Sequence, residues 1–137
     1  MAEIERRAER YGLPPMRWPD GWPGHYLMAM RAATYALRMN AGRDYTMSAF
    51  RLAFREGGDL SDPKNVLEAA ERAGLDAREV ERATEDPEIK QALKQATEGA
   101  HELGVFGVPT VAVDGQLFWG DDRLEAAAAH VVARACA

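Results

Sequence analysis

Residues 104–124 read GVFGVPTVAVDGQLFWGDDRL. Within them, Thr110–Val113 is apolar and mostly β-branched, which is typical of a strand. Asp114-Gly115 favours a tight hairpin turn, because both central residues of such a turn need positive φ. Gln116–Trp119 follows as the return strand. These residues therefore predict a β-hairpin.

A proline precedes this hairpin and two aspartates follow it. Pro109 has no N–H to donate and so fits the entrance of a strand. Sequence alone favours a trans Val108-Pro109 bond, since only about 5–6% of X-Pro bonds in folded proteins are cis. Asp121 and Asp122 open a helix, and Asp122 has capping-box spacing to Glu125. As a pattern, the aspartates indicate capping and macrodipole stabilisation ahead of ligand binding.

Helical signals fill most of the remaining sequence. Asp62, Asp76 and Asp86 each stand at a predicted N-cap. Gly42 is expected to interrupt the helical structure between two helices. Helices are expected over residues 2–11, 25–40, 45–56, 63–74, 76–84, 87–104 and 123–134. On the helix 45–56, the residues predicted to face inward are Met47, Phe50 and Phe54.

The segment 16–24 is expected to be a loop, and it contains Trp18 and Trp22. The tryptophans either line a substrate pocket or anchor the loop to the helices. Anchoring is the commoner use of such large amphipathic rings. Trp18 is a candidate substrate-binding residue on the first reading.

Length, composition and charge indicate one globular domain and exclude several kinds of partner. The 137 residues have the length of one domain, with 47% hydrophobic and 28% charged residues and a net charge of −5. No basic patch with interleaved aromatics indicates a nucleic-acid partner. No apolar run is long enough to span a membrane. His25, His101 and His130 lack ligand spacing, so no metal site is expected.

The expected compartment is the cytoplasm. The first residues, MAEIERR, are charged and lack the apolar core of a signal peptide. The single cysteine, Cys136, excludes an internal disulfide and fits a reducing compartment. As the penultimate residue, it is expected to belong to the tail rather than to act as a nucleophile.

Several segments together resemble one known family. The Gly-Val-Pro-Thr before the hairpin and the Phe-Trp-Gly-Asp-Asp-Arg-Leu after it resemble the closing part of the kappa-class glutathione transferase and 2-hydroxychromene-2-carboxylate isomerase family, within the DsbA-like thioredoxin folds. Four further segments resemble the helical insert of the same family and occur in the same order: RAERYGLP, MRAA, FREGGDLSDP and AGLD. The resemblance implies an α+β, mostly helical fold. A DsbA-like helical domain, residues 1–103, is followed by the C-terminal β-hairpin and helix of a thioredoxin fold, residues 104–137.

The resemblance also implies a glutathione site. In the family the bond before this proline is cis, and the backbone of Val108 would receive the cysteinyl part of glutathione. An extended tripeptide adds there like a strand. Asp122 would supply the carboxylate for the γ-glutamyl ammonium, with Asp121 beside it. The implied binding residues are Val108, Pro109, Asp121 and Asp122, with Trp18 from the loop.

Family members begin with a β-α-β unit that carries a catalytic serine, or Cys-x-x-Cys in the disulfide enzymes. Ser48 and Ser61 lie in the helical insert and do not match that serine. We therefore expect a chain that lacks this unit, and we assign no catalytic residue. The implied function is that of a glutathione-dependent isomerase or transferase acting on small aromatic compounds. The alternatives are a non-catalytic module that binds glutathione or a partner, and FrnE-like disulfide exchange with a partner's cysteines.

A lone hairpin is marginally stable in water and exposes its edges. The predicted hairpin is therefore expected to be covered by helices and to pair with another chain. A homodimer that joins two hairpins into one sheet would provide this pairing.

Overall fold

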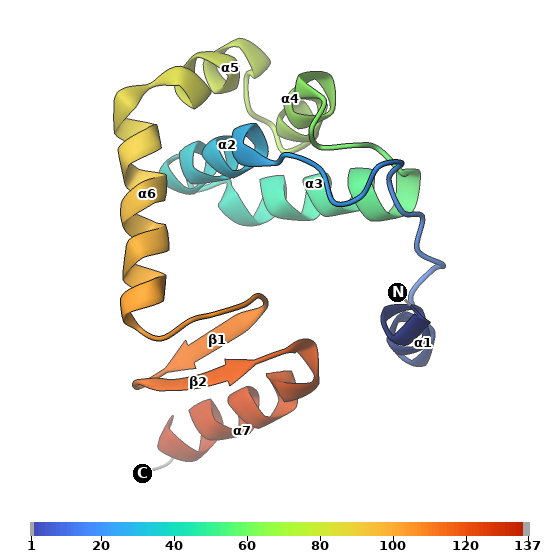
Figure 1. Ribbon diagram of the computed structural model, residues 1–137, viewed down its shortest axis with the longest axis vertical. Helices are drawn as coiled ribbons and strands as arrows, with labels where there is room; N and C mark the ends of the chain where they lie inside the picture. Colours follow the sequence, from blue (N-terminus) through green and yellow to red (C-terminus); the bar gives the residue numbers. More distant parts are fainter. Residues whose placement is uncertain (1, 136–137) are drawn as a thin grey trace. The chain divides into compact units, whose positions relative to one another are not determined.

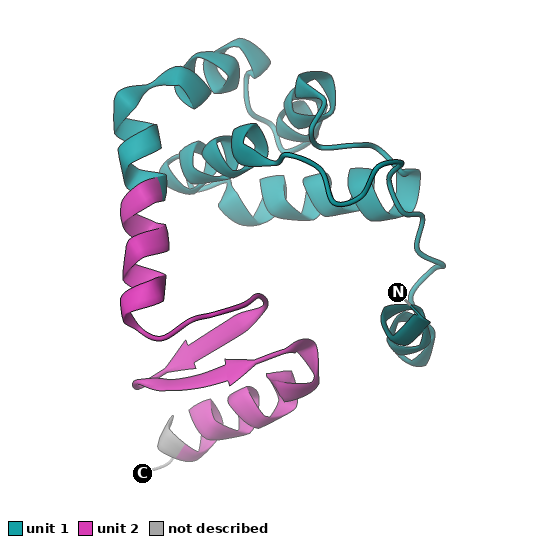
Figure 2. Cartoon of the chain, viewed as in Figure 1, with its two compact units in different colours: residues 1–93 teal, residues 94–137 magenta. Residues whose placement is uncertain are grey.

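The computed structural model describes residues 2–135 and divides the chain into two compact units (Figure 2). Unit 1 extends to Leu93 and unit 2 begins at Lys94. This division falls inside a helix. The expected domain boundary between residues 103 and 104 stays a prediction.

The described residues are mostly helical, with one antiparallel hairpin (Figure 1). The elements are α1 Ala2–Arg10, α2 Leu27–Arg38, α3 Gly42–Glu56, α4 Pro63–Arg72, α5 Ala77–Glu85, α6 Pro87–Glu102, β1 Thr110–Val113, β2 Gln116–Trp119, the 3-10 turn η1 Asp121–Arg123, and α7 Leu124–Ala135. The expected mostly helical α+β class is confirmed. In the part of the chain described, no helix has the length and apolar character needed to cross a membrane.

The three predicted aspartate caps are formed. Asp62 Oδ1 accepts a hydrogen bond from the backbone N–H of Lys64 at 2.9 Å, and Pro63 is the first residue of α4. Asp76 Oδ1 accepts from the N–H of Glu79 at 3.0 Å. Asp86 Oδ1 accepts in the same way at the start of α6, at 2.8 Å. Each carboxylate satisfies a helix N–H that has no intrahelical partner.

Small residues form the core of unit 1. α2 packs against α3, α4 and α5, and α3 packs against α4. Alanines at these contacts let the helices approach closely, and Tyr45, 2% exposed, is the largest side chain among them. The buried cluster consists of Ala29, Ala32, Ala36, Tyr45, Ala49, Val66, Ala69, Ala70 and Val80.

The structure corrects two expectations about α3. Gly42 is the first residue of the helix, where a Cβ would collide with the side chain of Leu37. Met47 and Phe50 were predicted to face inward but are 45% and 53% exposed. The predicted stripe is wrong because α3 has two apolar sides, and the side that contains Ala49 allows the closer approach of neighbouring helices.

Unit 2 is built on the predicted hairpin. Its turn residues Asp114 and Gly115 have φ values of 49° and 80°, as expected for that turn. The register pairs Val111 with Phe118. Phe118 is 5% exposed, and its ring lies 5.7 Å from that of His130 on α7. Helix α7 packs against both strands (Figure 1). The pairing of the hairpin with another chain stays a prediction.

Candidate functional site

The Val108-Pro109 turn presents exposed backbone. The bond between these residues is cis, as the family resemblance implied. The turn is fixed on both sides: Thr110 Oγ1 donates to the C=O of Gly107 at 2.6 Å, and the N–H of Gly120 donates to the C=O of Pro109 at 2.9 Å. Val108 is 88% exposed. Within the described residues its own N–H and C=O have no hydrogen-bond partner.

Two exposed aromatic rings accompany this turn. Phe106 and Trp119 are 76% and 53% exposed, and their ring centroids lie 4.9 Å apart. A Cβ at Gly107 would stand 2.6 Å from Trp119 Nε1, so a larger residue at this position would displace the ring from the backbone. Sequence reasoning did not select these three residues. The one signal was a glycine placed directly before Val108-Pro109.

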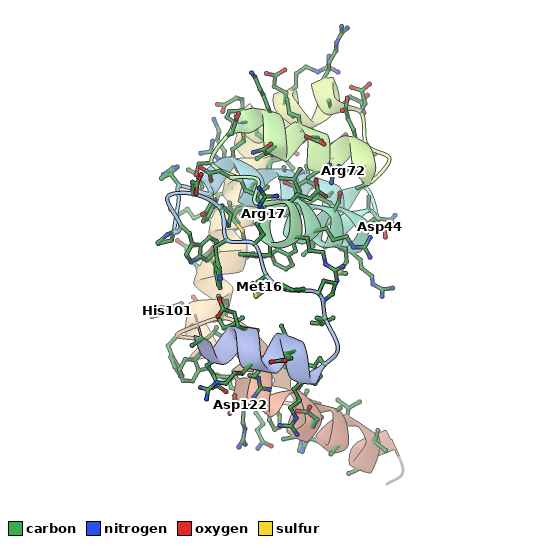
Figure 3. The ribbon with its side chains drawn as sticks, turned by 90° about the vertical axis from the view of Figure 1, so that its right-hand side faces the viewer. Met16, Arg17, Asp44, Arg72, His101 and Asp122 are labelled. Carbon is green, nitrogen blue, oxygen red and sulfur yellow. The ribbon has the colours of Figure 1, made fainter. Side chains whose placement is uncertain are left out.

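The two candidate aspartates lie beside this turn. The hydrogen bond from Gly120 to Pro109 brings the start of η1 next to it. Asp121 and Asp122 are both exposed, and a Cβ at Gly120 would stand 2.4 Å from Asp122 Oδ1. Asp122 is labelled in Figure 3. Gly120, with φ of 103°, is the N-cap of η1, so the helical segment begins before the predicted capping box of Asp122 and Glu125, which stays a prediction.

Trp18 lies in unit 1, in a cluster of aromatic rings. Its ring is 5.6 Å from Trp22 and 5.7 Å from Phe54. Its indole Nε1 donates to Glu5 Oε1 at 3.4 Å. These contacts are those of a loop anchor, and a role for Trp18 in substrate binding stays a prediction. Trp22 is 43% exposed and stacks on Tyr26 at 5.5 Å.

Unit 1 also contains an apolar cavity, here called the aromatic groove, with a volume of about 320 Å³. Its walls include Trp22, Tyr26, Met30, Tyr45, Phe50 and Phe54. The hydroxyls of Tyr26, Tyr45 and Thr46 in its lining already bond to backbone groups of the protein. Burial raises the pKa of Tyr45 to about 12. The groove therefore offers apolar contact and flat rings. The groove was not predicted from the sequence, because large apolar side chains on a helix are expected to be buried in the core.

The remaining candidate chemistry is sparse. Ser61 Oγ donates to Asp59 Oδ1 at 2.6 Å, which accounts for its hydroxyl. Across residues 2–135 there is no cluster of His, Cys, Asp and Glu that would hold a metal ion. Cys136 lies outside the described residues.

Three comparisons place the chain among known proteins. It is 31% identical over 125 residues to 2-hydroxychromene-2-carboxylate isomerase of Sphingobium xenophagum, covering 91% of this chain and 63% of that protein. It is 43% identical over 74 residues to human glutathione S-transferase kappa 1, covering 49% of this chain and 33% of the transferase. A solved structure of 2-hydroxychromene-2-carboxylate isomerase matches with a TM-score of 0.73 at 24% identity, covering 98% of this chain and 64% of that one.

The chain thus spans less than two thirds of the length of the relatives it matches. The structural match at 24% identity shows a shared fold. The sequence matches the DSBA-like thioredoxin domain over residues 1–132, so the match includes both the helical region and the hairpin. This confirms the resemblance drawn from the residues around Pro109 and Asp122. The chain belongs to the DSBA-like thioredoxin domain family.

Proposed function

We propose that the chain binds glutathione through residues 108–122 and serves a glutathione-dependent isomerisation of a small aromatic compound. The observation that carries this proposal is the exposed backbone of Val108, which has no partner among the described residues and lies beside two exposed carboxylates. The names of its relatives, an isomerase and a glutathione transferase, support the same chemistry.

The residues around Val108 fit an extended peptide. The N–H and C=O of Val108 would pair with the cysteinyl residue of glutathione, as one strand pairs with another. Asp122 would accept hydrogen bonds from the γ-glutamyl ammonium, with Asp121 adding negative charge beside it. When bound, glutathione would supply a thiol that adds reversibly to an unsaturated substrate. This chain's part would be to hold the peptide and orient it.

The aromatic groove of unit 1 supports the proposed substrate class. Its volume of about 320 Å³ falls at the small end of ligand cavities, which run from about 300 to 1,000 Å³. Because the lining hydroxyls are already bonded, recognition would come from the flat faces of rings such as Trp22 and Phe54. A planar, largely apolar ring system matches these walls.

A calorimetric titration with glutathione tests the peptide site. Asp122→Asn removes the charge at nearly constant size, and Asp20→Asn makes the same charge change in an exposed loop of unit 1. We expect the first variant to bind about five- to tenfold more weakly, as for a charge-assisted hydrogen bond that is partly exposed. The second variant should bind as the parent does.

The capped dipeptide N-acetyl-Cys-Gly sharpens this experiment because it lacks the γ-glutamyl ammonium and keeps the cysteinyl amide N–H. Its affinity should be lower than that of glutathione and should not change in Asp122→Asn. An equal loss for both ligands would contradict the assignment of Asp122 to the ammonium. Absence of binding at millimolar glutathione would overturn the peptide site itself.

A non-catalytic binding role is the second candidate, and the exposed apolar residues of unit 2 favour it. Phe106, Val108 and Trp119 together offer a surface to a partner chain or a second copy. Sedimentation of the parent chain over a range of concentrations distinguishes a homodimer from a monomer. Disulfide exchange would need cysteines from a partner, since the sequence contains one. A cytoplasmic location is part of the same proposal.

A further inference from the structure

A second cavity of different chemistry lies in unit 1, between α3 and the end of α4. Its volume is about 560 Å³, and we call it the arginine groove. Its lining includes three arginines and two carboxylates, on a chain whose net charge is −5. The charged lining residues are Arg43, Asp44, Arg51, Glu56 and Arg72. Asp44 and Arg72 are labelled in Figure 3. These five side chains carry one more positive than negative charge, on an acidic protein.

An ion-pair network centred on Arg72 forms the side of the groove at the end of α4. Arg72 donates to both carboxylate oxygens of Glu56, at 2.6 and 2.8 Å, and to Glu68 Oε1 at 2.6 Å. The hydrogen bonds from Arg72 lower the pKa of Glu56 below its usual range. Glu56 is therefore charged, and it shares Arg72 with Glu68, so this network adds no positive charge to the groove. An anion in the groove would depend on the other arginines.

On the side of the groove formed by α3, two arginines have no ion pair. Arg43 and Arg51 are exposed on α3, and neither forms a salt bridge or side-chain hydrogen bond within the described residues. They are eight positions apart, which is about 12 Å along a helix axis. Guanidinium groups on such long side chains can converge on one anion between them. Their combined charge exceeds that of Asp44, the one lining carboxylate without an ion pair among the described residues, and it is available to a ligand.

Ser48 supplies the second observation. It lies between these arginines in the sequence of α3, is 8% exposed and lines the same groove. Thr34 and Thr46 bond to the carbonyls of Met30 and Gly42, four residues earlier. Ser48 makes no such bond, and its hydroxyl has no partner within the described residues. Its oxygen is not among the fully enclosed unpartnered side-chain atoms of the described residues, so it opens to the groove, where its O–H can donate to a ligand.

We propose that the arginine groove binds a small molecule bearing a phosphate monoester. A phosphate has three oxygens, which match the three donor groups of Arg43, Ser48 and Arg51. A phosphate monoester also concentrates a charge near −2 on one group, whereas a carboxylate carries −1, so two arginines favour the phosphate. The site lies entirely within unit 1 and uses none of the residues assigned to glutathione.

Titration with phenyl phosphate and with inorganic phosphate tests the proposal, with succinate as the carboxylate comparison. Arg43→Gln and Arg51→Gln should each weaken phosphate binding about tenfold, the effect of losing a hydrogen bond to a charged group. Arg55→Gln is the matched control, because Arg55 is exposed on the same helix and lies outside the groove lining. It should leave the affinity within about twofold of the parent.

Ser48→Ala separates a binding role from a structural one. Because the hydroxyl has no partner among residues 2–135, its removal should leave the ligand-free thermal midpoint unchanged or higher. It should weaken phosphate binding several-fold and leave glutathione binding unaltered. An Arg55→Gln loss equal to that of Arg51→Gln, or phosphate and succinate of equal affinity, would overturn the proposal. So would the absence of saturable phosphate binding. The glutathione titration distinguishes these outcomes from a failure of the peptide site.

Discussion

Tyr45 gives the protein a dependence of stability on alkaline pH. Its side chain is 2% exposed, its hydroxyl donates to the C=O of Ala29 at 3.3 Å, and burial raises its pKa from 10.0 to about 12. Between these values the unfolded chain loses the phenol proton while the folded chain keeps it. Stability is therefore retained below pH 10 and falls as pH rises toward 12. The loss across that window is about 2–3 kcal/mol.

The substitution Tyr45→Phe removes this titration. At pH 8 it should cost only the hydrogen bond, about 0.5–1.5 kcal/mol, and between pH 10 and 11.5 the variant should lose less stability than the parent. Tyr35→Phe is the control. The pKa of Tyr35 is raised by desolvation and then by Glu79, but this side chain is only partly buried, so most of the alkaline loss should remain. Urea unfolding followed by far-UV circular dichroism measures all three proteins. Equal alkaline losses in the parent and Tyr45→Phe would refute the reasoning.

Three further substitutions test the local structure, with unfolding in urea as the measurement. Asp62→Ala removes the acceptor for the N–H of Lys64 and should cost about 1 kcal/mol; no loss would contradict the cap. Gly115→Ala places a side chain at φ of 80° and should cost about 1–2 kcal/mol. Gly99→Ala, inside α6 with no neighbouring atom within 4 Å, should instead stabilise by about 0.5–1 kcal/mol. A stabilising Gly115→Ala would contradict the turn.

Features that depend on a few adjacent residues were predictable from the sequence. The caps at Asp62, Asp76 and Asp86 need only a carboxylate within reach of N–H groups two or three residues away. The hairpin turn at Asp114-Gly115 needs only two residues that tolerate positive φ. No tertiary contact competes with these local preferences, so they are retained in the folded chain.

Features that depend on which helix face meets a neighbour were not predictable in this way. Helix α3 presents Phe50 on one side and Ala49 on another, and periodicity favours the larger side chain for the core. The structure buries Ala49, because a small residue lets the neighbouring helices approach. Phe50 instead lines the aromatic groove. The choice depends on the shape of the partner helices, which periodicity does not encode.

The candidate site contains some residues that the sequence identified and others that only the tertiary structure shows. Val108, Pro109 and Asp122 were selected through their resemblance to a family motif, and the structure brings the Pro109 turn next to the start of η1 through the hydrogen bond from Gly120. The approach of Gly107 to Trp119 was missed. To predict this contact, one must know that a ring on β2 lies over the backbone before Pro109. The strand register determines that placement, and neither residue type indicates it.

A site made of backbone groups also limits how mutagenesis can find it. The groups that Val108 offers are its N–H and C=O, and every side-chain substitution except proline retains both. Replacing Val108 by alanine would therefore leave the proposed peptide contacts in place. The ligand is the better reporter, because methylation of the cysteinyl amide nitrogen of glutathione removes the donor that would pair with the C=O of Val108. A chain that binds the methylated and unmethylated tripeptides equally would not be using that carbonyl, whatever the effect of Asp122.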